Sequence, residues 1–158
     1  MATRKRRTRR RQDETVYYVI EIERWDWGYS FGVNNIRTIE DPYLEFRHLE
    51  IEGKLLRPGA VKVERAGLVL MPDKRLNEEN RARNTPKVVG SLNLHKGMLQ
   101  GLLSMPSDAL GPVLQMLIAG RLDFAVLEGT RLHYRHGTVK HLRLDGTFDE
   151  DDLPPEDE

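Results

Sequence analysis

The sequence contains no cysteine, which excludes disulfides, thiolate nucleophiles and cysteine-ligated metal sites. It also lacks any run of about 18 apolar residues, the length that a membrane-spanning helix requires. Its first apolar run, residues 16–20, ends at Glu21 and is too short for the hydrophobic region of a signal peptide. We therefore expect no integral membrane association and a cytoplasmic location, or a nuclear one if the source is eukaryotic.

Each end of the chain lacks charge of one sign. Residues 1–12 carry six arginines, one lysine and no acid, whereas residues 145–158 carry eight acids and no base. Blocks of like charge repel themselves and rarely fold alone. We therefore predict a disordered basic arm over 1–14, a single β-rich domain over 15–145 and a disordered acidic tail over 146–158.

Alternating apolar residues dominate the middle of the chain. In residues 16–24, VYYVIEIER, the apolar positions fall on one face of a strand and are β-branched or aromatic. The apolar phase then changes from even to odd positions, which predicts a bend near residues 24–28 before a second strand. Further strand patterns lie at 43–53, 60–71 and 87–95, and as three short stretches between 121 and 144.

Two segments have a helical pattern. Met98, Leu99, Leu102 and Leu103 are at helical spacing, and Pro112 with Gly120 delimits a helix at about 112–119. Residues 72–86 have little to bury and predict an exposed loop or a short surface helix. The fold class expected from these patterns is mainly β (α+β). It is an antiparallel sandwich or open barrel of about eight short strands, with two short helices inserted before the last three strands.

Both tryptophans belong to one alternating stripe, Trp25, Trp27, Tyr29 and Phe31. Stacking platforms for single-stranded nucleic acid need exposed aromatics beside basic residues. Here the intervening residues are Asp26, glycines and a serine, which fits a strand whose large face packs on a core. The stripe therefore favours the wall of a core, and the alternative is a binding platform.

The basic arm is the strongest functional signal in the sequence. Arginine makes bidentate contacts with phosphate, and clustered positive charge binds nucleic-acid backbones. We therefore expect a non-catalytic binding module, without a cofactor, whose arm contacts nucleic acid or an acidic protein and whose folded body supplies specificity or self-association. The expected nucleic-acid-binding residues are Arg4, Lys5, Arg6, Arg7, Arg9, Arg10 and Arg11. The alternative is a protein–protein interaction module, such as an inhibitor or assembly subunit, with tails that steer association.

A third alternative is a small metal-dependent nuclease. Asp41, Glu52 and Lys54 occur in the order of a D…ExK motif, in which two carboxylates hold a divalent ion and a lysine polarises the phosphate. However, such a pattern arises by chance in a chain that is 32% charged. The histidines between 133 and 141 match no zinc-ligand spacing, so we predict no metal site there.

Overall fold

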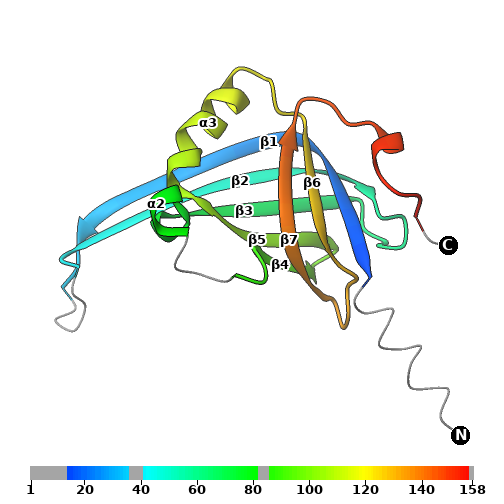
Figure 1. Cartoon of the computed structure of the whole chain (residues 1–158), viewed down its shortest axis with the longest axis horizontal. Helices are drawn as coiled ribbons and strands as arrows, with labels where there is room; N and C mark the ends of the chain where they lie inside the picture. Colours follow the sequence, from blue (N-terminus) through cyan, green and yellow to red (C-terminus); the bar gives the residue numbers. More distant parts are fainter. Residues whose placement is uncertain (1–13, 36–40, 82–85, 157–158) are drawn as a thin grey trace, which may run out of the picture.

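The chain forms a closed barrel with a long two-stranded extension (Figure 1). The computed structural model describes residues 14–35, 41–81 and 86–156. Within them, seven strands close in the order β1-β2-β3-β5-β4-β7-β6. The strands are β1 (Thr15–Val33), β2 (Tyr43–Arg57), β3 (Arg65–Asp73), β4 (Gly90–His95), β5 (Met98–Pro106), β6 (Phe124–Thr130) and β7 (His136–Asp145).

The pairing of the strands is antiparallel except between β3 and β5, which are parallel. The first strand pairs with β6, with Thr15 opposite Thr130, and this pairing closes the sheet into a barrel. The predicted mainly β, antiparallel class is confirmed. In the described residues the stretch 121–144 holds two strands rather than the three predicted.

Residues 98–106 form strand β5 and not the predicted helix. Leu99, Gly101, Leu103 and Met105 are buried, and the residues between them are exposed. The sequence hid this two-residue period because the inward position 101 is a glycine, while the outward Leu102 is 55% exposed. A Cβ at Gly101 would lie 2.6 Å from a methyl carbon of Leu68 on the neighbouring strand β3, so a larger residue there would displace that side chain.

Inward-facing side chains from all seven strands fill the barrel. The largest fully buried ones are Tyr18, Ile20, Leu49, Ile51, Leu68, Leu70, Leu92, Leu99, Leu103, Leu127 and Val139. Burial of one such aliphatic side chain contributes about 1.5–3 kcal/mol of transfer free energy. These side chains form one hydrophobic core that stabilises the barrel.

The change of apolar phase in β1 is a β-bulge and not the predicted bend near 24–28. Ile22 lies opposite Gly53 and Arg24 lies opposite Glu52, so Glu23 has no residue opposite it. One extra residue switches the faces of every residue that follows while the strand continues. Gly53 is required here because a Cβ would overlap the backbone of Glu21.

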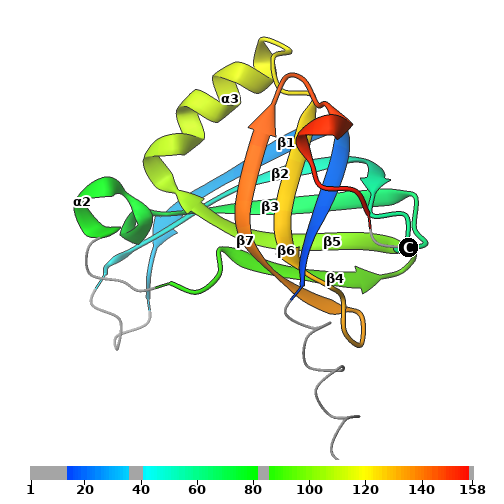
Figure 2. The ribbon, with the colours of Figure 1, turned by 45° about the vertical axis from the view of Figure 1, so that its right-hand side comes forward.

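Short helices lie on the outside of the barrel (Figure 2). Helix α3 (Leu110–Ile118) confirms the predicted helix at 112–119 and is followed by Gly120 with a φ of 66°. Helix α2 (Glu78–Arg81) and the 3-10 turn η1 (Lys74–Leu76) form the predicted surface helix; η2 (Ser107–Ala109) and η3 (Glu150–Asp152) are further single turns. None of the helices in the described ranges has the length and apolar character needed to cross a bilayer.

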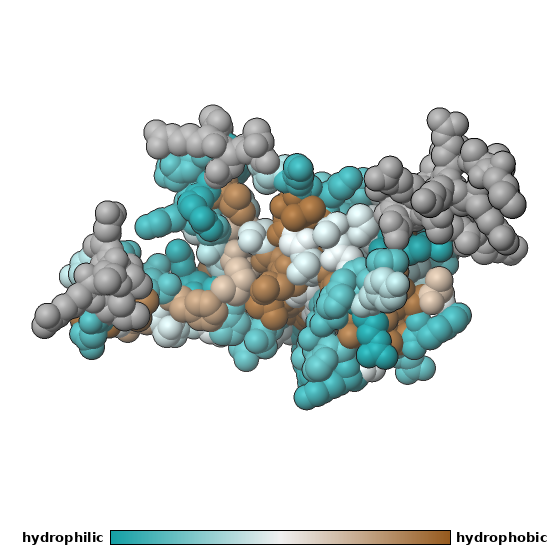
Figure 3. All heavy atoms as spheres, turned by 90° about the horizontal axis from the view of Figure 1, so that it is seen from below, coloured by the Kyte–Doolittle hydropathy of each residue, from teal (hydrophilic) through white to brown (hydrophobic). Residues whose placement is uncertain are grey.

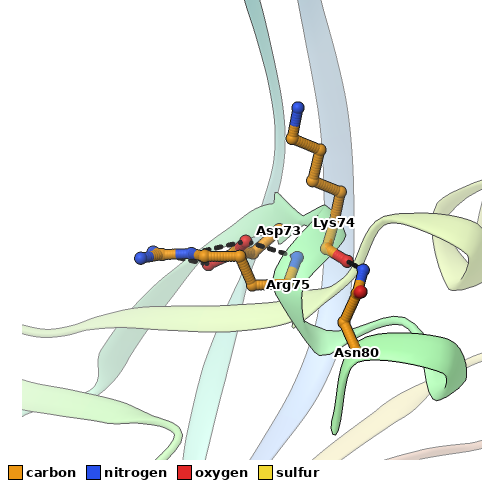
Figure 4. A network of polar contacts seen from close by, with 4 residues as sticks. All are labelled: Asp73, Lys74, Arg75 and Asn80. Carbon is orange, nitrogen blue, oxygen red and sulfur yellow. Dashed lines mark hydrogen bonds and ion pairs between the residues drawn. The ribbon is translucent and has the colours of Figure 1, made fainter. Parts of the chain in front are cut away.

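Asp73 organises the surface turn after β3 (Figure 4). Its carboxylate accepts a bond of 2.9 Å from the backbone N–H of Arg75 and another of 2.9 Å from the guanidinium Nη2 of the same residue. The side-chain amide of Asn80 donates to the carbonyl of Lys74 at 2.9 Å. The bonds from Arg75 hold the pKa of Asp73 below its ordinary value.

Residues 146–156, in the predicted acidic tail, contact the barrel, and we call them the acidic segment. Arg57, only 9% exposed, donates from Nη2 to the carbonyl of Pro154 at 2.7 Å, and its Nε lies 3.3 Å from Glu156 Oε1. The carboxylate of Glu156 also accepts from the N–H of Gly59 at 3.1 Å. A buried guanidinium needs compensating partners, and the acidic segment supplies them.

Candidate functional site

Two surfaces of the structure are candidates for function, and the first is the extension of β1 and β2. The first strand pairs with β6 only up to Glu21, and the second pairs with β3 only from Leu49 onward. Residues 28–33 and 43–48 therefore continue as two strands with no third strand beside them, and we call residues 23–33 with residues 43–50 the ribbon (Figure 1).

The predicted core wall of Trp25, Trp27, Tyr29 and Phe31 is correct only for its first residue. Trp25 packs against the core opposite Ile51. Trp27, Tyr29 and Phe31 are 45%, 54% and 62% exposed. They continue the inward face of the barrel, but the pairing of β2 with β3 ends at Leu49, opposite Trp27, and beyond this level the sheet has two strands. Most of the stripe is therefore surface.

The ribbon has two different sides, because cross-strand partners share a face. The aromatic face holds Trp27, Tyr29, Phe31 and Val33 of β1 with Tyr43, Glu45 and Arg47 of β2. Glu45 Oε1 lies 3.3 Å from Arg47 Nη2, and Glu45 accepts a 3.1 Å bond from the Tyr29 hydroxyl, which raises the pKa of Tyr29. With one acid and one base, this face is neutral.

The opposite side of the ribbon is acidic. Asp26 lies opposite Glu50, and the imidazole Nε2 of His48 lies 3.5 Å from the Glu50 carboxylate. The ring of His48 occupies the space over Gly28, where a side chain would collide with it, and Phe46 beside it is 48% exposed. Figure 3 shows hydrophobic atoms at the surface of the half of the molecule that carries the ribbon.

The second candidate surface lies at the other end of the barrel. It consists of the β4–β5 turn, residues 95–97, and the β6–β7 turn, residues 131–136, which we call the turn surface. The backbone of Leu94 donates to the carbonyl of Arg135 at 2.9 Å, so the two turns are neighbours. The chain has no acid between residues 129 and 144, but it has Arg131, Arg135, Lys140, Arg143 and three histidines there.

Both turns hold residues in the left-handed region of φ. Tyr134 and Arg135 have φ values of 48° and 68° between the paired His133 and His136, and Lys96 has 51°. Consecutive positive φ values are typical of tight hairpin turns but disfavoured for side chains other than asparagine, aspartate and glycine. The turn thereby holds Tyr134 outward, 85% exposed, between basic neighbours.

Tyr18 supports the turn surface from inside the barrel. Its hydroxyl donates to the carbonyl of Thr130 at 2.7 Å, directly before the β6–β7 turn. Burial raises the pKa of Tyr18 to about 12, and the nearby charge of Arg131 opposes that rise. The phenol therefore stays protonated at neutral pH and keeps donating this bond.

Strand β1 begins beside this turn, with Thr15 opposite Thr130. Arg4 to Arg11, including all seven predicted phosphate-binding residues, lie outside the described residues, and their role stays a prediction. The first described residue, Glu14, has its Oε2 3.9 Å from Nη2 of Arg131. The acid-free stretch between 129 and 144 was a sequence signal for this surface, but only strand pairing places it next to the start of β1.

The D…ExK residues do not converge. Asp41 precedes β2 at the outer end of the ribbon, where it accepts a 3.0 Å bond from the N–H of Tyr43. Glu52 is eleven positions further along an extended strand, roughly 36 Å at 3.3 Å per residue, and it pairs with Arg24. Lys54 is exposed in the barrel part of β2. In the described ranges, no three histidine, aspartate or glutamate side chains are placed to hold a metal ion.

No family model, curated protein or solved structure matches the chain. We therefore infer its function from its own sequence and structure.

Proposed function

We propose that the protein is a nucleic-acid-binding module whose basic arm and turn surface together contact the phosphate backbone. One observation carries the proposal: the described chain starts beside the turn surface. Thr15 pairs with Thr130, and Glu14 approaches Arg131 to 3.9 Å. Residues 4–11, with seven positive charges, precede this point by only a few positions, and the acid-free turn adds two more arginines.

The chemistry of the turn surface suits a single strand in particular. Arginine side chains contact phosphates bidentately, and an exposed ring between them can stack on a base, which is worth about 1–3 kcal/mol per base. Tyr134, at 85% exposure, is such a ring. The aromatic face of the ribbon is neutral and its other side is acidic, so the ribbon is a poorer partner for phosphate.

The test is the salt dependence of binding, measured by fluorescence anisotropy with a labelled random duplex and a labelled single strand. If roughly five to seven arm charges displace counterions, the slope of log K against log salt is about −4 to −6 on duplex DNA. Deletion of residues 1–12 should flatten that slope by the same amount. Equal binding by the full chain and the deletion, or no binding at about 50 mM salt, would refute the proposal.

Matched substitutions separate the turn surface from general charge. Lys96→Gln should weaken binding and reduce the slope by about one, whereas Lys74→Gln, on the surface turn after β3, removes the same charge and should leave both unchanged. Tyr134→Ala should weaken single-strand binding about fivefold or more and affect the duplex less. If Lys96→Gln and Lys74→Gln change the affinity and the salt slope equally, the nucleic acid does not contact the turn surface.

A further inference from the structure

We propose that the aromatic face of the ribbon is a self-association surface that binds the same face of a second copy of this chain. This inference is independent of nucleic-acid binding. It starts from the exposure of Trp27, Tyr29 and Phe31 at 45–62% and of Val33 and Tyr43 at 67% and 54%. Half-exposed aromatic side chains of about 200 Å² each make a patch of roughly 500 Å², at the upper end of what monomers expose.

The charge of the face argues against nucleic acid and for a second copy. Its charged residues are Glu45 and Arg47, two positions apart on β2 and 3.3 Å from each other. A phosphate backbone needs net positive charge, which this neutral face lacks. An isologous interface instead needs a surface that is complementary to itself. A face with one acid beside one base has this complementarity of charge.

A single two-fold axis satisfies both the charges and the rings. Ser30 and Phe46 are opposite each other in the ribbon. We place the two-fold axis in the plane between the two faces, perpendicular to the strands and level with this pair. Each residue on one side of the pair then meets, in the second copy, the residue of the same strand that lies equally far on the other side. Glu45 then meets Arg47 of the second copy, and Phe31 meets Tyr29 of the second copy. Trp27 meets Val33 in the same register.

The area sets the expected strength. Roughly 500 Å² from each copy gives about 1,000 Å² in total, below the 1,600 Å² of a standard interface. Aromatic residues at the centre and charges beside them are the usual composition of interface hot spots. A dimer that dissociates in the micromolar range is therefore expected, and the full chain should be dimeric at about 100 µM and largely monomeric at about 0.1 µM.

The experiment is sedimentation velocity on nuclease-treated full chain across that range of concentration. Phe31→Ser should raise the dimer dissociation constant at least about tenfold, whereas Glu50→Gln, on the opposite side of the ribbon, should not change it. Thermal unfolding of both variants confirms that they fold. A chain that stays monomeric at about 100 µM, or a Phe31→Ser variant that dimerises like the native chain, would overturn the proposal.

A charge exchange tests the two-fold pairing itself. Glu45→Arg places like charges opposite each other in its homodimer, and Arg47→Glu does the same with the other sign. Each variant alone should dimerise at least about tenfold more weakly, but an equimolar mixture should form heterodimers, because the two altered faces complement each other. If the equimolar mixture dimerises no more tightly than either variant alone, Glu45 does not face Arg47 of the second copy. Association that requires added single strand would instead identify the face as a stacking platform.

Discussion

Replacement of Gly53 by alanine tests the bulge that directs the aromatic stripe to its face. A Cβ at this position would overlap the carbonyl oxygen of Glu21 and would lie 2.7 Å from its carbonyl carbon and 3.1 Å from Ile22 Cα. These are backbone atoms, so no side-chain rotation relieves the contact. Overpacking of this kind costs about 1–3 kcal/mol and sometimes more. Gly53→Ala should therefore lower the free energy of unfolding by at least about 1–3 kcal/mol.

Gly32→Ala, in the paired strand β1, is the matched control. A Cβ there meets nothing within 4 Å, and alanine restricts the unfolded chain, so the expected change is a gain of about 0.4–1 kcal/mol. The assay is urea unfolding of both variants at one protein concentration, with equal m-values as the check on two-state behaviour. If Gly53→Ala is as stable as Gly32→Ala, β1 and β2 do not approach each other as described and the bulge is wrong.

Three further predictions concern the exposed stripe, the surface turn and the acidic segment. Phe31→Ala should cost only about 1 kcal/mol in urea unfolding, against about 2–5 kcal/mol for Leu103→Ala in the core; equal costs would restore the core interpretation of the stripe. Because the pKa of Asp73 is lowered on folding, its stabilisation is complete above the ordinary value of 3.8 and is lost as pH falls through the lowered pKa. The stability difference between the native chain and Asp73→Asn should thus shrink in acid-titrated unfolding experiments, and a difference that grows below pH 3.8 would contradict this. Truncation after residue 153 leaves Arg57 without Pro154 and Glu156 and should cost about 1–3 kcal/mol, more than Glu156→Gln, whose amide oxygen still accepts from Gly59; a neutral truncation would show that the docking contributes nothing.

The strands were predictable from alternation wherever inward positions are large and outward ones polar. The pattern of β1 up to Ile22 meets this condition, whereas β5 does not, because Gly101 points inward and Leu102 outward. The phase change after Ile22 was visible in the sequence, but a bulge and a bend produce the same change. The local sequence pattern therefore predicts which residues share a face of a strand. It does not predict whether the strand continues straight through a bulge or bends.

Whether an apolar side chain is buried depends on which strands cover its face of the sheet. The alternation of apolar and polar residues does not predict this. Trp25 and Phe31 share one face of β1, yet the first packs on the core and the second is 62% exposed, because the pairing of β2 with β3 ends between them, opposite Trp27. The docking of the acidic segment was likewise hidden, since Arg57 and Pro154 are 97 positions apart. The proximity of Glu14 and Thr15 to the β6–β7 turn follows only from the closure of the barrel by β1 and β6.

If the basic arm and the turn surface form one contact with nucleic acid, titration with a short single-stranded oligonucleotide should reveal it in the amide chemical shifts. We expect the amides of residues 95–97 and 131–136 to shift together with those of the arm, while those of residues 23–33 do not. Shifts confined to the ribbon, or none at saturating strand, would contradict it.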